Sequence, residues 1–134
     1  MPRFLSFALV VLVLAPLPAA ADEAWTSKHG KIVYQSERDG AALLYFDHPD
    51  GSQAMLVVPG LAGNYTDRGV HEAYWVGTGE GTCDALLAIT KGHGAHHWGR
   101  ARIAFDKPAF PTDFTMMLGD CFGPLDRSIR AERP

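Results

Sequence analysis

Three of the six histidines lie within five residues, in the segment Lys91-Gly92-His93-Gly94-Ala95-His96-His97-Trp98. Neutral imidazole is a good ligand for Zn²⁺ or Cu²⁺, and Gly92 and Gly94 favour a flexible loop that could turn several rings toward one ion. The candidate metal ligands are therefore His93, His96 and His97, with His71, Glu72 or Asp84 as a fourth. The alternative is a solvated loop whose histidines titrate near neutral pH.

A second candidate site is the long polar connection that runs from Gly60 to Gly69. Loops on rigid scaffolds often carry binding residues, and Tyr, Trp and Arg are enriched at binding hot spots. The predicted binding surface consists of Gly63, Asn64, Tyr65, Arg68, Tyr74 and Trp75. For Tyr65 and Trp75, the alternative is that they close one end of the hydrophobic core.

The residue patterns of common hydrolases are missing from this chain. His71-Glu72 begins an H-E-x-x-H motif, but Trp75 stands where the second His is needed. Neither a G-x-S-x-G elbow nor a glycine-rich phosphate loop occurs. Paired carboxylates for glycoside hydrolysis meet only in space, so an unrecognised hydrolase stays open as an alternative. The sequence favours a non-catalytic protein.

These candidate residues have to be positioned by short strands. Runs rich in Val, Ile, Leu, Tyr and Phe alternate with Gly, Pro and Asp turn signals such as Asp39-Gly40. The predicted strands are Lys31–Ser36, Ala41–Phe46, Gln53–Val58, Val70–Gly77, Thr82–Thr90, Gly99–Phe105 and Asp113–Asp120, with a helical turn at Asp84–Ala88 as an alternative and a frayed tail at 126–134. This pattern predicts an all-β fold, a small antiparallel barrel or sandwich of about seven to eight strands.

The N-terminus predicts export. A basic start at Arg3, an apolar run and the small residues Ala19 and Ala21 indicate a signal peptide over 1–21, which leaves a single β domain over 22–134. Because an oxidising compartment favours disulfides, Cys83 and Cys121 are expected to pair; the alternative is a Cys nucleophile. No Cys adjoins the cleavage site, so we expect a soluble periplasmic or secreted protein that is not a lipoprotein.

Composition limits the classes of partner. The formal net charge is -3, from 12 Lys and Arg against 15 Asp and Glu, and no basic cluster occurs. Nucleic-acid binding is therefore not expected. The mature chain has no second long apolar run, so a membrane partner is not expected after cleavage of the signal.

One stretch resembles a known family. Ala62-Gly63-Asn64-Tyr65-Thr66-Asp67, followed by Tyr74-Trp75-Val76-Gly77, is similar to the signature of periplasmic C-type lysozyme inhibitors. The resemblance implies an exported, eight-stranded antiparallel barrel with a disulfide, which inhibits by inserting a Ser and a Lys among lysozyme carboxylates. This chain has Ala62 and Val76 at those two positions, so Arg68 or Lys91 would have to supply the cation.

Together these features predict an exported binding protein that resembles an inhibitor of a lysozyme-type hydrolase. The alternative function is a periplasmic Zn- or Cu-binding protein that uses the histidine segment.

Overall fold

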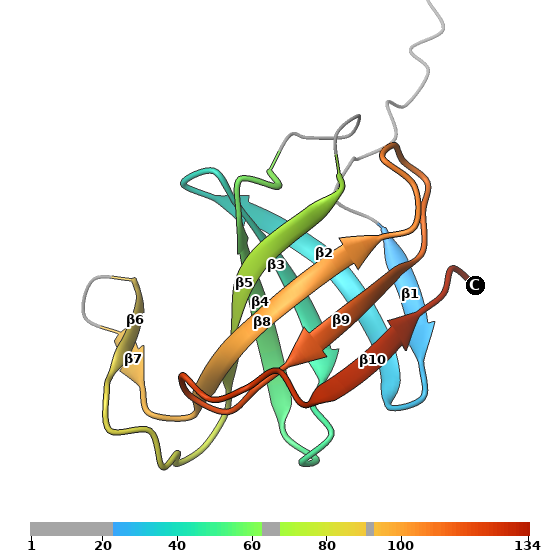
Figure 1. Cartoon of the computed structure of the whole chain (residues 1–134). Helices are drawn as coiled ribbons and strands as arrows, with labels where there is room; N and C mark the ends of the chain where they lie inside the picture. Colours follow the sequence, from blue (N-terminus) through green and yellow to red (C-terminus); the bar gives the residue numbers. More distant parts are fainter. Residues whose placement is uncertain (1–22, 63–67, 91–92) are drawn as a thin grey trace, which may run out of the picture.

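The computed structural model describes residues 23–62, 68–90 and 93–134, and for residues 89–90 and 93–94 it describes the backbone alone. Ten β-strands form the regular structure of these residues (Figure 1). The strands are β1 (Ala24–Ser27), β2 (Gly30–Arg38), β3 (Ala41–Asp47), β4 (Gln53–Pro59), β5 (Val70–Gly77), β6 (Leu87–Thr90), β7 (His93–Ala95), β8 (Trp98–Phe105), β9 (Phe114–Leu118) and β10 (Arg127–Ala131). The described residues contain no helix that is long and apolar enough to cross a membrane. The predicted signal peptide, 1–21, lies outside them.

Eight of the strands form one antiparallel sheet in the order β1-β2-β3-β4-β5-β8-β9-β10. Its first and last strands meet at a bridge, where the main chains of Thr26 and Glu132 exchange two hydrogen bonds of 2.7 and 2.9 Å. The sheet thus closes into a nearly complete barrel (Figure 1). The prediction of a small antiparallel β protein is confirmed, and of the two predicted architectures it is the barrel that forms.

The hairpin from β2 to β3 shows how local residues determine this topology. Asp39 and Gly40 have φ angles of 51° and 80°. Two successive residues with positive φ make a tight turn whose twist matches that of the paired strands. Along β3, the buried residues Ala42, Leu44 and Phe46 alternate with outward-facing ones, as the period of two in a strand requires.

Buried apolar side chains from all eight strands fill the barrel interior. Trp25 and Trp75 donate their indole N–H groups to the carbonyl oxygens of Thr112 and Gly119, at 2.8 and 2.7 Å. Because a buried N–H without a partner is costly, these bonds allow both large rings to lie in the core. Phe114 packs edge-on against Trp25, with 4.9 Å between the ring centroids.

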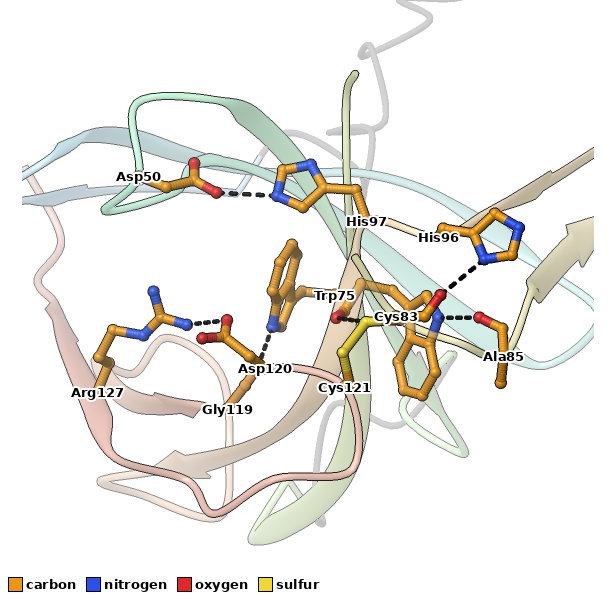
Figure 2. Close-up of a disulfide and its surroundings, with 11 residues drawn as sticks. Asp50, Trp75, Cys83, Ala85, His96, His97, Gly119, Asp120, Cys121 and Arg127 are labelled. Carbon is orange, nitrogen blue, oxygen red and sulfur yellow. Dashed lines mark hydrogen bonds and ion pairs between the residues drawn. A yellow bond between two sulfur atoms is a disulfide. The ribbon is translucent and has the colours of Figure 1, made fainter. Parts of the chain in front are cut away.

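The remaining strands, β6 and β7, form a separate hairpin in the connection between β5 and β8. A disulfide between Cys83 and Cys121 joins the segment before this hairpin to the segment after β9 (Figure 2). Val76, Cys83 and Trp98 form a second buried cluster, against which the hairpin packs. The predicted disulfide is confirmed, so neither cysteine is a free nucleophile.

The structure corrects the prediction for the segment that contains the hairpin. Neither a strand over the whole of Thr82–Thr90 nor a helical turn at Asp84–Ala88 forms; only β6 is a strand. The preceding residues are held by other contacts, namely the disulfide at Cys83 and a 2.9 Å hydrogen bond from the Trp98 indole to the Ala85 carbonyl.

Each end of the domain contains a strand that was not predicted from the sequence. Residues 126–134, expected to fray, contain β10, which pairs with β9 along its length and buries Ile129 and Ala131. Strand β1, which was not predicted, has four residues and lies just after the predicted cleavage site.

Candidate binding surface

Of the predicted binding residues that the structure describes, some lie on the surface and some are buried. Gly63, Asn64 and Tyr65 lie outside the described residues. Tyr74 is on the outer face of β5 and is 37% exposed, whereas its neighbour Trp75 points into the barrel and is 1% exposed. Trp75 is therefore a core residue, which was the alternative left open by the sequence, and it does not face a partner.

Arg68 is buried, which corrects its predicted place on the binding surface. Its guanidinium donates to both carboxylate oxygens of Glu23, with Nη1···Oε2 2.9 Å and Nη2···Oε1 2.5 Å. The rings of Phe105 and Phe110 lie 5.3 and 5.2 Å from the guanidinium carbon, within the range of cation–π contacts. A guanidinium engaged in this way does not supply a cation to the carboxylates of a partner.

A cluster of polar side chains surrounds the buried ring of Trp75. His48 packs on this ring with 4.2 Å between the centroids, and its Nδ1 accepts the Asp50 N–H at 3.1 Å. His97 meets the same ring edge-on, and its Nε2 lies 2.9 Å from an Asp50 carboxylate oxygen (Figure 2). Its Nδ1 lies 2.9 Å from the Thr78 carbonyl oxygen. The cluster therefore ties the β3–β4 turn to the connections before β6 and before β8.

Burial and hydrogen bonding set the ionisation of His48 and Asp50. Burial lowers the pKa of His48 from its ordinary value of 6.5; the Asp50 carboxylate opposes this change, and the positive charge of Arg127 adds to it. Burial raises the pKa of Asp50, but hydrogen bonds from Ser52 and His97, together with the positive charge that His48 carries at low pH, outweigh it and hold this pKa at about 2. At neutral pH, His48 is therefore neutral and Asp50 is a carboxylate.

The candidate metal ligands His96 and His97 are turned toward different partners (Figure 2). His96 Nδ1 lies 2.8 Å from the carbonyl oxygen of Cys83, while both ring nitrogens of His97 face other oxygen atoms. His93 is the first residue of β7 and does not lie in a flexible loop. The structure describes only its backbone. In the part of the chain that the structure describes, no three His, Cys, Asp or Glu side chains are grouped to hold a metal ion.

The outer face of β2–β5 carries a continuous set of apolar side chains, which we call the outer patch. The strand register places them in two adjacent rows, Val33, Tyr45 and Met55 in one and Leu43, Val57 and Tyr74 in the other. Residues directly opposite each other on antiparallel strands share a face, so each row is contiguous. Tyr45 is 44% exposed and Tyr74 37%, and the other four are half-buried.

The barrel's own hairpin covers the continuation of this surface. Met55 pairs with Val76, and Val76 pairs with Trp98, so the first row runs on beneath β6 and β7. There Val76 and Trp98 are only 8% and 2% exposed. Among the described residues, nothing covers the outer patch in the same way.

A groove of about 200 Å³ lies at the β2–β4 side of the outer patch. Val33 and Tyr45 form its apolar walls, and Lys31 and Asp47 place charges beside them. Gln35 and Gln53 add polar groups to the lining. An exposed aromatic ring beside polar and charged groups is typical of residues at a protein interface. Tyr74 was predicted from the sequence and Tyr45 was not, although the alternation of Leu43 and Tyr45 with buried residues was a usable signal.

Comparisons of the chain with protein-family models, with curated proteins and with solved structures found no significant match. Function is therefore inferred from the residues and their geometry, together with the resemblance of the Ala62–Gly77 segment.

Proposed function

We propose that this protein is an exported, non-catalytic binding protein that docks a protein partner through the outer patch. The observation that carries the proposal is the pair of contiguous apolar rows across β2–β5, with Tyr45 and Tyr74 exposed. Apolar surface residues are usually scattered, and a contiguous set with a polar rim marks interaction sites. Strands of this nearly closed barrel present these side chains on a rigid backbone, which reduces the entropy lost on binding.

The proposed partner is a cell-wall hydrolase of the C-type lysozyme kind. The resemblance of Ala62–Gly77 to lysozyme inhibitors supports this choice, and the fold that it implies, an eight-stranded antiparallel barrel with a disulfide, is the fold of this chain.

The proposed contact differs from insertion of a cation. Val76, at the position of the family's Lys, is buried beneath the β6–β7 hairpin, and Arg68 is paired with Glu23. Lys91 lies outside the described residues. We therefore assign the contact to the outer patch.

The experiment is a titration of the purified protein into a lysis assay with a C-type lysozyme and isolated cell walls. We expect lytic activity to fall to a plateau as the protein saturates the enzyme, and we expect no lysis by the protein alone. Full lysozyme activity in the presence of excess folded protein would rule out this partner. Lysis by the protein alone would instead support the hydrolase alternative.

A further inference from the structure

The barrel is incompletely closed between β1 and β10. Beyond the Thr26–Glu132 bridge, the start of β10 and the turn between β1 and β2 diverge, which leaves a wedge visible in Figure 1. A cleft of about 430 Å³ occupies this wedge. Lys28 and His29 of the turn line one side of the cleft, and β10 lines the other.

The main chain of β10 directs hydrogen-bonding groups into this cleft. In an antiparallel ladder, successive residues turn both N–H and C=O alternately toward one neighbouring strand and the other. The N–H and C=O of Glu132 face Thr26 of β1. Those of Arg130 and Ser128, two and four residues earlier, therefore face the same side, while those of Ile129 face β9.

These groups have no main-chain partner within the described residues. The backbone hydrogen bonds between β1 and β10 there are the two at Thr26 and Glu132. A strand edge with free N–H and C=O groups is a template for another extended segment. Closure normally removes such edges from a barrel, so this cleft is a local departure from the rest of the fold.

We propose that the cleft is a peptide-binding site, in which a short extended segment of a partner protein adds a strand to β10. The main-chain groups of Ser128 and Arg130 would pair with the segment, as in other cases of strand addition. The bridge at Glu132 ends the free edge on one side and the start of β10 ends it on the other, so the segment spans only a few residues.

Charges of both signs line the cleft: on the β10 side the Glu132 carboxylate lies 3.9 Å from Arg130 Nε, and on the other side Lys28 favours an acidic residue in the segment. Lys28 is exposed in the turn and brings a positive charge to the rim. Arg130 forms ion pairs with Asp106 and is held on the outer surface of β10. A carboxylate on the segment would therefore be oriented by Lys28, and rim charges of this kind contribute to selectivity and association rate.

The test measures amide hydrogen exchange in the purified protein by NMR, in the presence of each of three synthetic peptides at millimolar concentration. The first peptide is acetyl-Val-Glu-Val-Thr-Val-amide; the second has Lys for Glu, and the third has Pro for the central Val. We expect the first to slow exchange at Ser128 and Arg130 by about tenfold or more. The Lys peptide should slow it less, and the Pro peptide should have no effect because Pro interrupts strand pairing.

A matched pair of variants tests the role of the main chain. Ser128→Pro removes an N–H that faces the cleft and leaves the bonds to β9 in place, so the peptide effect at Arg130 should disappear. Ser128→Ala keeps the main chain and should keep the effect. If Ser128→Pro does not fold, the comparison of the three peptides on the unaltered protein still decides.

Three results would overturn the proposal. One is unchanged exchange with every peptide, and a second is equal slowing by the Pro peptide. The third is slowing without peptide as the protein concentration rises, which would place a second copy of the chain in the cleft. The cleft lies between β1 and β10 while the outer patch centres on β3 and β4, so either site can fail without the other.

Discussion

At the scale of residues, Glu23 and Arg68 form a buried ion pair that is stabilised by its geometry. Their exposed fractions are 9% and 1%, and two hydrogen bonds join the guanidinium to the carboxylate. Removing two charges from water is costly, and their mutual attraction compensates only when both are present. The role of Arg68 is therefore to stabilise the barrel, and its substitution should act on folding before it acts on any partner.

We expect Glu23→Gln to lower the free energy of unfolding by about 3 kcal/mol, because it leaves the Arg68 charge buried without a carboxylate. The double variant with Arg68→Met should lose less than Glu23→Gln alone. Urea denaturation measures both. The control is Glu72→Gln in the exposed pair with Arg102, which should change stability by at most about 1 kcal/mol. An equal loss of unfolding free energy in Glu23→Gln and in Glu72→Gln would show that the buried pair does not stabilise the barrel more than an exposed pair does.

His48 makes the stability of the barrel depend on pH. Its pKa in the folded protein lies below the ordinary value of 6.5, so the unfolded chain takes up a proton at a higher pH than the folded chain does. The free energy of unfolding should therefore fall as the pH drops below 6.5. Asp50 stays ionised throughout this range, because its pKa is about 2.

The measurement is denaturation at several values between about pH 7 and about pH 5. His48→Asn keeps an acceptor for the Asp50 N–H and removes the titrating ring, so its stability should depend less on pH in this range. His96→Gln, at an exposed position, is the control and should retain the pH dependence of the unaltered protein. The same pH dependence in His48→Asn as in the unaltered protein would show that another group is responsible.

At the scale of elements, the β6–β7 hairpin covers one part of the outer apolar face. The disulfide fixes the segment before it, and the Trp98 indole bonds to the Ala85 carbonyl. Phe122 packs edge-on against Trp98 from the segment after β9, with 4.8 Å between centroids. These contacts make Val76 and Trp98 a small core outside the barrel.

The double variant Cys83→Ser/Cys121→Ser should lower the free energy of unfolding by about 4 kcal/mol, since the bond closes a loop with a sequence separation of 38 residues. Amide exchange at Val76 and Trp98 should increase more than exchange within β3 and β4. Equal increases throughout the barrel would show that the disulfide does not act through the hairpin.

The elements that could be predicted were those with local signals. Asp39-Gly40 identified a hairpin and β5 was predicted with its observed bounds, because turns and alternation act over a few residues. The strands β1 and β10 were missed although each pairs with its neighbour in the sequence, because β1 has only four residues and β10 has only two buried ones. The bridge that brings them together joins Thr26 and Glu132, which are 106 residues apart. Likewise, the burial of Arg68 depends on Glu23, 45 residues away, and the rows of the outer patch depend on register.

At the scale of the whole molecule, one barrel presents two surfaces of different chemistry. The outer patch offers apolar and aromatic side chains over β2–β5, whereas the cleft between β1 and β10 offers main-chain hydrogen-bonding groups. The core and the disulfide hold both surfaces on one rigid frame. A protein of this design is suited to binding, since neither surface needs a large rearrangement to meet a partner.

Calorimetric titration of a C-type lysozyme decides whether the outer patch binds this proposed partner. Tyr45→Ala/Tyr74→Ala removes both exposed rings from the patch, and Met117→Ala, at a 38% exposed position on β9, is the matched control. We predict that the double variant, while folded, binds at least about tenfold more weakly, whereas Met117→Ala binds like the unaltered protein. Equal dissociation constants for all three proteins, or no binding by the unaltered protein, would contradict the claim.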